Sequence, residues 1–203
     1  MFLLSWLTRQ PAADTDAAEV ARARDGDESA FEALVSRHER TVWRVCRRML
    51  GDPDAATDAT QDAFLRVYRA LGRFRGEATF RTWVIGIAIN VCRNHLGSAA
   101  ARLGRHSVPL DDSPAGGESR PLPLPDPAPG PEALARASEV REALERAMKR
   151  LAPEHREVIV LAEIQGMPHE TIAAAIGVRA GTVKSRLSRA RAALRKELEG
   201  VWP

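Results

Sequence analysis

A cluster of prolines divides this chain in two. Eight of its thirteen prolines lie between Pro109 and Pro131, in a chain of 203 residues. Proline lacks a backbone N–H donor, and a stretch so rich in it cannot build a core. We therefore expect a flexible linker at residues 98–131, between an N-terminal unit at 27–97 and a C-terminal unit at 132–198. Short extensions at 1–26 and 199–203 complete the chain.

The linker allows the two units to lie well apart. As extended polyproline, at about 3.1 Å per residue, the segment from Pro109 to Pro131 would reach roughly 70 Å. Each unit holds fewer than 100 residues, so each is expected to be a small domain. The hydrophobic content of 44% and the charged content of 28% are ordinary for globular proteins.

The cysteines and the apolar segments indicate a cytoplasmic protein. Two cysteines, Cys46 and Cys92, cannot form a disulfide framework, and we interpret them as structural thiols in a reducing compartment. The apolar stretch from Met1 to Leu7 is much shorter than the roughly 20 residues that span a bilayer. It also lacks the basic leader and the cleavage site of a signal peptide.

Apolar residues recur at helical spacing through the N-terminal unit. Ser29 and Glu32 form a capping-box pattern that predicts the start of a helix, and Gly51 predicts its end. Asp52 followed by Pro53 predicts the next start. The predicted helices cover 29–50, 53–71 and 80 to about 97. No period-two alternation is sustained, so we expect no sheet.

The C-terminal unit is also predicted to be helical. One helix is expected from Leu134 to Met148 and another, entered through Pro153, up to Gln165. Shorter helices are expected at 168–176 and 180–198, separated by the turn at 177–179. That pair has the spacing of a helix-turn-helix motif. The fold class predicted is therefore all-α, with two small helical domains joined by the linker.

The last predicted helix carries a strong positive charge. Seven basic residues and no acidic residue lie between Thr171 and Lys196. An apolar stripe through Val183, Leu187 and Ala190 would face inward, leaving Lys184, Ser185, Ser188 and Arg189 facing outward. A helix packed on one side with long donors on the other suits the DNA major groove. The alternative is an ordinary solvated basic face.

Aromatic and arginine residues alternate in the N-terminal unit. Five of the ten aromatic residues lie between Phe64 and Trp83, among five arginines. Unpaired bases stack on aromatic rings with about 1–3 kcal/mol per base, so this composition suits single-stranded nucleic acid. The alternative is a hydrophobic core with a charged rim.

An acidic face precedes that cluster. No basic residue lies between Leu50 and Leu65, and Asp58, Gln61 and Asp62 share one face of their predicted helix. Such a face would repel DNA, so it either faces solvent or binds a basic protein surface. Periodicity does not choose between the two.

Patterns typical of enzymes are missing. The five histidines are scattered, and no HExxH, phosphate-binding glycine loop or GxSxG occurs. Cys92 and His95 alone make a weak metal site, so we expect no metal and no cofactor. A DNA recombinase with a C-terminal helix-turn-helix would need a nucleophilic serine or tyrosine beside clustered arginines, and Tyr68 is the only tyrosine.

Two long motifs resemble the extracytoplasmic-function (ECF) subfamily of bacterial RNA polymerase sigma factors. Region 2 of that family is similar to Asp58–Phe64, Phe74–Gly76, Thr79–Trp83 and Ile87–Asn90, and the recognition helix of its region 4 is similar to Gly181–Arg191. The resemblance covers most of the chain. It implies a non-enzymatic, cytoplasmic transcription factor that binds core RNA polymerase, directs it to promoters and promotes strand opening. An anti-sigma factor is implied as a further partner.

The resemblance also implies roles for individual residues. The polymerase-binding residues would be Asp58, Gln61, Asp62 and Phe64. The promoter DNA would be bound both as duplex, at the minus-thirty-five element, and as melted single strand, at the minus-ten element. The residues that bind the minus-ten element would be Phe74, Arg75, Gly76, Thr79, Phe80, Trp83 and Asn90. The residues that bind the minus-thirty-five element would be Thr182, Lys184, Ser185, Arg186, Ser188, Arg189 and Arg191.

The reach of the linker suits this interpretation. Two promoter elements two DNA turns apart, at roughly 34 Å per turn, lie about 70 Å from each other, which is comparable with the extended length of the linker.

The chain departs from the family pattern at three positions. Pro168 and Arg179 stand where relatives often have a serine at the start of a helix, and Thr171 stands where glutamate is frequent. An alternative function is a helix-turn-helix transcriptional regulator that acts without being a polymerase subunit.

Overall fold

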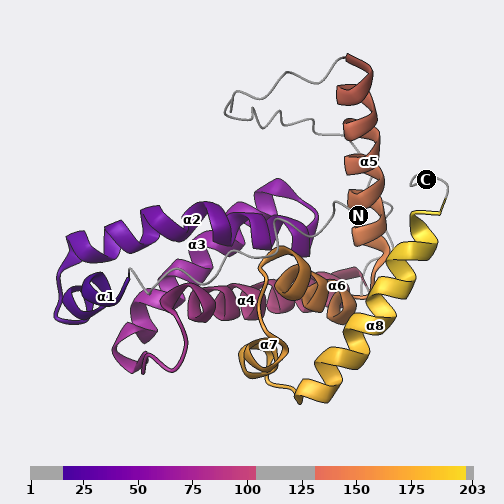
Figure 1. Ribbon diagram of the computed structural model, residues 1–203. Helices are drawn as coiled ribbons and strands as arrows, with labels where there is room; N and C mark the ends of the chain where they lie inside the picture. The colour runs from indigo at the N-terminus through magenta and orange to yellow at the C-terminus, as the bar shows by residue number, and fades with distance from the viewer. Residues whose placement is uncertain (1–15, 104–130, 200–203) are drawn as a thin grey trace.

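The computed structural model describes residues 16–103 and 131–199, and every regular element in these ranges is helical (Figure 1). The N-terminal helices are α1 Ala17–Arg24, α2 Glu28–Leu50, α3 Pro53–Ala70 and α4 Phe80–Leu103, with a 3₁₀ turn η1 at Leu71–Arg73. The C-terminal helices are α5 Pro131–Arg150, α6 Pro153–Ile159, α7 His169–Ile176 and α8 Ala180–Glu197, with a π-helical turn η2 at Val160–Ile164. The all-α prediction is confirmed. Most of the linker and residues 1–13 lie outside the described residues.

Local capping signals explain where α2 and α3 begin. Asp52 caps α3 as predicted: its Oδ1 accepts from the Ala55 N–H at 2.7 Å. The prediction for α2 was wrong, because Asp27 rather than Ser29 is the cap and accepts from the Ala30 N–H at 3.2 Å. Aspartate is as good a capping residue as serine, and the Ser29 hydroxyl instead donates to Asp27 at 2.6 Å.

The N-terminal unit is longer at both ends than the sequence predicts. Helix α4 continues through Gly97 to Leu103, into the segment expected to be linker. A glycine inside a helix costs only about 1 kcal/mol, and the alanines at 99–101 favour helix. At the other end α1 packs on α2, with Val20 buried, although residues 1–26 were expected to be an extension. The described unit therefore spans residues 16–103.

Helices α2, α3 and α4 pack together around the core of this unit. Leu34, Val45, Val67 and Ile89 are fully buried there. Cys46 and Cys92 are free and buried in the same core, which agrees with a structural role. Within the described residues, no helix is long and apolar enough to cross a membrane.

The C-terminal unit contains the predicted helix-turn-helix. Helix α7 ends at Gly177, whose φ of 69° is the left-handed conformation that favours glycine, and α8 follows after Arg179. Both α6 and α7 pack against α8.

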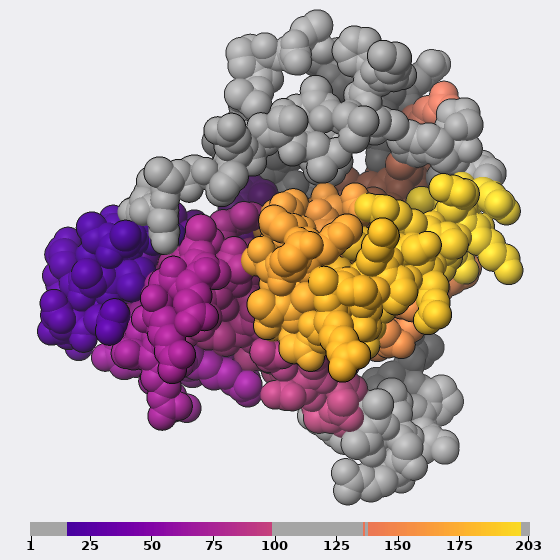
Figure 2. Space-filling model, turned by 60° about the horizontal axis from the view of Figure 1, so that its bottom comes forward, coloured from indigo at the N-terminus to yellow at the C-terminus, as the bar shows by residue number. Residues whose placement is uncertain are grey.

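The two units lie against each other, although the linker would allow them to separate. Helix α7 contacts α4, and α6 and η2 contact α2. One continuous cluster of buried apolar side chains runs through both units. In the space-filling view the C-terminal helices, orange to yellow, cover one side of the magenta α4 segment (Figure 2). This placement brings the candidate DNA-binding elements of both units together.

Candidate nucleic-acid and polymerase interfaces

Helix α8 has the division into buried and exposed faces that the sequence predicts. Val183 and Leu187 are buried against the C-terminal unit. Lys184, Ser185, Ser188 and Arg189 are exposed. Neither Pro168 before α7 nor Arg179 before α8 provides a side-chain cap, so these helix starts are weaker than serine-capped ones.

The supporting residues of α8 are held by neighbours. Thr182 and Arg186 are half-buried. The Ser185 hydroxyl donates to the Thr182 carbonyl at 3.0 Å. Arg191 donates from Nε to Glu163 of η2 at 2.9 Å. Arg191 is therefore fixed to the body of the unit and presents only part of its guanidinium to a ligand.

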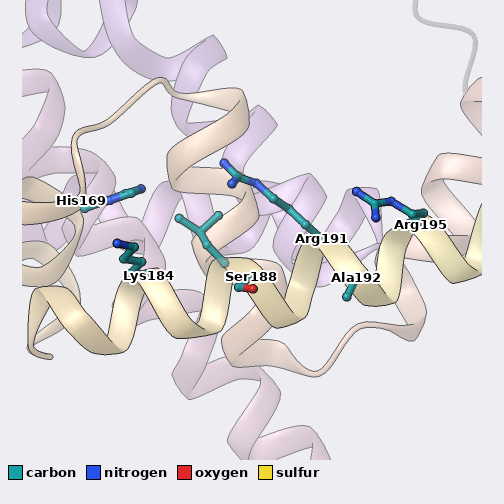
Figure 3. Close-up of a pocket in the computed structure, with 7 residues that line it drawn as sticks. His169, Lys184, Ser188, Arg191, Ala192 and Arg195 are labelled. Carbon is teal, nitrogen blue, oxygen red and sulfur yellow. The ribbon is translucent and has the colours of Figure 1, made fainter.

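A basic hollow of about 460 Å³ runs beside α8. Lys184, Ser188, Arg191 and Arg195 line it from one side of the helix, and His169 reaches it from the start of α7 (Figure 3). The sequence did not single out His169, since it lies 15 residues before Lys184. Its position as the first residue of the motif's first helix is the signal that could have found it. A concave basic surface of this kind attracts phosphate groups.

Three aromatic rings pack together where α4 begins. The ring centroids of Phe74 and Trp83 are 4.9 Å apart, and Phe80 lies 6.0 Å from Phe74 and 5.9 Å from Trp83. Phe80 is fully buried, so its ring is part of the core in this structure, and its role as a base-binding residue stays a prediction. Phe74 and Trp83 are half-buried, so each residue keeps part of its surface exposed.

The loop before α4 presents polar groups around this aromatic cluster. Arg75 and Gly76 are exposed, and Gly76 has a φ of 73°. Thr79 caps α4 by accepting from the Thr82 N–H at 3.2 Å. Asn90 is exposed on α4, where its amide oxygen accepts from Arg93 at 3.2 Å. The predicted minus-ten residues thus all lie on or beside the first half of α4, with Phe80 buried.

Helix α3 carries the acidic face. Asp58, Gln61 and Asp62 are exposed on it, and Asp62 lies 3.6 Å from the ring of His95. Phe64 is only 8% exposed and belongs to the core. Its side chain lies on the inner face of the helix, and the interpretation of Phe64 as a polymerase contact stays a prediction.

Two exposed apolar side chains extend this face, and the sequence analysis missed them. Leu65 and Tyr68 are each 55% exposed, and they follow Gln61 at helical offsets of four and seven. The Tyr68 ring packs edge-on against Phe31 of α2, with centroids 5.0 Å apart. The missed signal is an apolar residue on a polar stripe of an amphipathic helix. In the described part of the chain, no group of His, Cys, Asp and Glu is arranged to hold a metal ion.

Comparison with known proteins identifies the family of this chain. Residues 34–102 match the family model of sigma-70 region 2, and residues 141–194 match that of sigma-70 region 4. The ECF RNA polymerase sigma-E factor of Escherichia coli K12 is 33% identical over 188 residues, which are 91% of this chain and 95% of that protein. The chain belongs to the ECF sigma factors. The sigma-H factor of Pseudomonas aeruginosa is likewise 33% identical, over 89% of this sigma factor and 92% of its own length.

Solved structures agree with the observed fold of the sigma factor. CnrH, in complex with the cytosolic domain of CnrY, is 29% identical, covers 91% of the chain and 97% of its own, and superimposes with a TM-score of 0.61. The sigma factor RpoE of Bartonella quintana, in complex with the anti-sigma factor NepR, is 20% identical, covers 84% and 97%, and superimposes with a TM-score of 0.65. The second likeness is one of fold alone.

Proposed function

We propose that this sigma factor binds core RNA polymerase through α3, melted minus-ten DNA through the start of α4, and the minus-thirty-five element through α8. The proposal rests on the presence of three chemically distinct surfaces: an acidic one on α3, an aromatic one at the start of α4 and a basic one on α8. The first two lie in the part that matches region 2, and the third lies in the part that matches region 4. The sigma factor would select promoters without catalysis of its own, in the cytoplasm where the polymerase works.

The polymerase contact combines charge with apolar area. Asp58, Gln61 and Asp62 would meet a basic surface of the polymerase, while Leu65 and Tyr68 supply the apolar part. Interfaces derive most of their binding energy from a few such aromatic and apolar residues, with charges at the rim that orient the partner. Leu65 and Tyr68 replace Phe64 in this assignment, since Phe64 is buried.

Strand opening would be driven by binding of unstacked bases. Trp83 and Phe74 are the half-buried rings on whose faces a base would stack, at about 1–3 kcal/mol per base, which offsets the few kcal/mol needed to unstack it. Arg75, Thr79 and Asn90 would contact the phosphates and base edges. The buried Phe80 supports Trp83 from beneath.

The outward face of α8 would recognise duplex DNA. Lys184, Ser185, Ser188 and Arg189 point away from the core and would reach base edges and phosphates in the major groove. Thr182, Arg186 and Arg191 would support them. His169 and Arg195, which line the adjoining hollow, add phosphate contacts.

An anti-sigma factor is a further expected partner. The solved structure of CnrH, which is 29% identical to this chain, holds the cytosolic domain of CnrY, and the sigma factor RpoE of Bartonella quintana was solved with the anti-sigma factor NepR. A partner that covers the same α3 face, with its exposed Leu65 and Tyr68, would prevent the sigma factor from binding the polymerase.

Run-off transcription with purified core polymerase tests the proposal. The expected result is transcription from promoters of the encoding genome only when the sigma factor is added. Asp58→Ala combined with Tyr68→Ala should abolish co-purification with core polymerase, whereas Glu39→Ala, an exposed carboxylate on α2, should not. Arg189→Ala should weaken promoter binding, while Lys196→Ala, exposed near the end of the same helix, should have a smaller effect. Failure to stimulate any promoter would contradict the proposal.

A further inference from the structure

Helix α1 is fastened to the N-terminal unit, although the part that matches region 2 begins only at residue 34. Arg37 of α2 donates to Glu19 of α1 at 2.8 Å and forms a salt bridge with Asp16, the residue that precedes α1. Helix α1 also contacts η1, the 3₁₀ turn that ends one residue before Phe74. The helix therefore lies against the segment that leads into the aromatic cluster.

A buried polar pair lies between α1 and α2. His38 Nε2 is 2.7 Å from Asp16 Oδ2, and the two side chains are only 8% and 6% exposed. A carboxylate can only accept a hydrogen bond, so the imidazole N–H donates to it. Polar groups buried to this degree are costly unless they are hydrogen-bonded. The bond to Asp16 therefore fixes the orientation of the His38 ring.

The His38 ring also contacts the aromatic cluster at the start of α4. Its centroid lies 5.5 Å from that of Phe80. The buried Phe80 ring in turn lies 6.0 Å from Phe74 and 5.9 Å from Trp83, and ring pairs at such separations attract each other in preferred orientations. A continuous series of contacts thus connects Asp16, in front of α1, with the two half-buried rings.

We propose that His38 is a positioning residue for strand opening. Held by Asp16, its ring fixes Phe80, which in turn holds Trp83 in the arrangement that accepts an unstacked base. The inference rests on the proposed function of the start of α4. A binding site needs side chains whose orientation is locked by packing and by supporting hydrogen bonds, because a ring that must be ordered on binding loses affinity. Helix α1 then belongs to the minus-ten binding unit.

Two substitutions test the proposal without changing a residue assigned to DNA. Asp16→Ala removes the acceptor that orients His38. His38→Gln is the second test, since its amide can still donate to Asp16 but offers no ring to Phe80. Both variants should disturb Trp83 and reduce strand opening.

Three further variants separate positioning from stability. Glu19→Ala is the matched control for Asp16→Ala, because it removes another bond between α1 and α2 and leaves the buried pair in place. Asp16→Asn keeps an acceptor oxygen at the same position and should retain most of the function. Val45→Ala leaves a cavity in the same core about two helical turns beyond His38, so it lowers stability without touching the pair.

The position of Trp83 is measured in the free full-length chain. Fluorine-19 NMR of protein labelled with 5-fluorotryptophan gives one signal for each of the four tryptophans, and Trp83→Phe assigns the signal of Trp83. This signal should shift or broaden in Asp16→Ala and His38→Gln, and should stay in place in Asp16→Asn, Glu19→Ala and Val45→Ala. The spectra are recorded at a temperature where circular dichroism melting shows that every variant is folded.

Strand opening is measured at the same temperature with core polymerase, on a promoter that the unmodified chain transcribes. Permanganate reactivity of unpaired thymines should fall about tenfold in Asp16→Ala and His38→Gln. This loss corresponds to about 1.4 kcal/mol, which lies within the value of one stacked base. Reactivity in Glu19→Ala and Val45→Ala should equal that of the unmodified chain. Co-purification with core polymerase should be the same for all variants, because α3 is unchanged.

Three results would overturn the proposal. They are an unchanged Trp83 signal or unchanged strand opening in Asp16→Ala and His38→Gln, a loss in Asp16→Asn as large as in Asp16→Ala, and an equal loss in Val45→Ala, which would make the pair structural only. In each case the unmodified chain still opens the promoter, so only the positioning role fails. If the unmodified chain opens no promoter, the proposed function fails and this inference fails with it.

Discussion

Replacing Arg93 with methionine should open the two units of the sigma factor. The variant keeps most of the side-chain length and removes the charge that balances Glu157. Since Glu157 is 2% exposed and Arg93 is its salt-bridge partner at 2.6 Å, the closed form of Arg93→Met would hold an uncompensated buried carboxylate. In the open form water hydrates that carboxylate. The substitution therefore favours opening.

The size of the effect follows from the burial of the pair. Removing one partner of a fully buried ion pair costs about 3–5 kcal/mol, and because the Arg93 side chain is 35% exposed we expect the lower figure. Protonation of a glutamate with an ordinary pKa near 4.3 costs about 3.7 kcal/mol at pH 7, which caps the penalty. A shift of about 3 kcal/mol changes the ratio of open to closed molecules by about a hundredfold.

The double variant Arg93→Met with Glu157→Met supplies the control. Replacing both partners of a buried ion pair by apolar residues of similar size is often neutral or stabilising. Energy transfer between dyes on cysteines introduced at Glu39 of α2 and Lys196 of α8, both exposed, should therefore show the short separation of the unmodified chain in the double variant and a longer one in Arg93→Met. If single and double variants open to the same extent, packing rather than the unpaired charge is responsible, and the reasoning fails.

The same assay should depend on pH with a definite sign. Glu157 faces Arg93 from α4, Arg186 from α8 and Glu154 on its own helix, and burial is the largest effect, raising the pKa of Glu157 above its ordinary value. The closed form then binds a proton more readily than the open form, where Glu157 is hydrated. Lowering the pH from neutral should therefore favour the closed form, and the double methionine variant should lose this dependence. A shift toward the open form at low pH would contradict the assignment.

Four further substitutions test the fold and the site. Arg156→Met should lower the melting temperature by roughly 10 °C, because a buried guanidinium that donates to the carbonyls of Met49, Met148, Lys149 and Leu151 is lost; an unchanged melt would contradict this. In urea unfolding, Phe80→Ala should lower the free energy of unfolding by about 3–5 kcal/mol, because it leaves a cavity in the core. Trp83→Ala should mainly reduce strand opening, which is detected by the permanganate reactivity of unpaired thymines. Hydrogen bonds from Ser29, Arg22 and Ala30 lower the pKa of Asp27 to about 2, so its stabilisation of α2 should disappear as the pH falls from about 4 to 2; in Asp27→Asn this part of the pH dependence of melting should be absent.

Helix starts were predictable from sequence wherever the signal is local. At α3 the pair Asp52 and Pro53 supplies both a capping oxygen and a residue preset for the first turn. At α2 two capping residues compete within three positions, and Asp27 is the cap although the Ser29 pattern also fits. The end of α4 was predicted too early, because a single glycine was given more weight than the alanines after it.

The candidate site was predicted less completely, because exposure is a property of the packed molecule. The motif assigns Phe80 and Trp83 together, yet one ring is fully buried and the other is accessible. The contact between α4 and α7 joins residues more than 80 positions apart. Helical periodicity describes which face of a helix is apolar, and it does not identify the element that packs against a face of small and charged residues.

The contact between the units consists of groups that can find other partners when the units separate. Arg156 would lose its bond to Met49 of α2 but keep three carbonyl acceptors within the C-terminal unit. Glu157 would gain water, and Arg93 and Arg81 would be free to meet DNA phosphates. Few polar groups are then left unsatisfied by opening, so its free-energy cost comes mainly from exposing the apolar side chains of the cluster that runs through both units. A ligand that binds only the open form shifts such an equilibrium by its difference in affinity for the two forms, so a partner separates the units only if that difference exceeds the cost of exposing this apolar cluster.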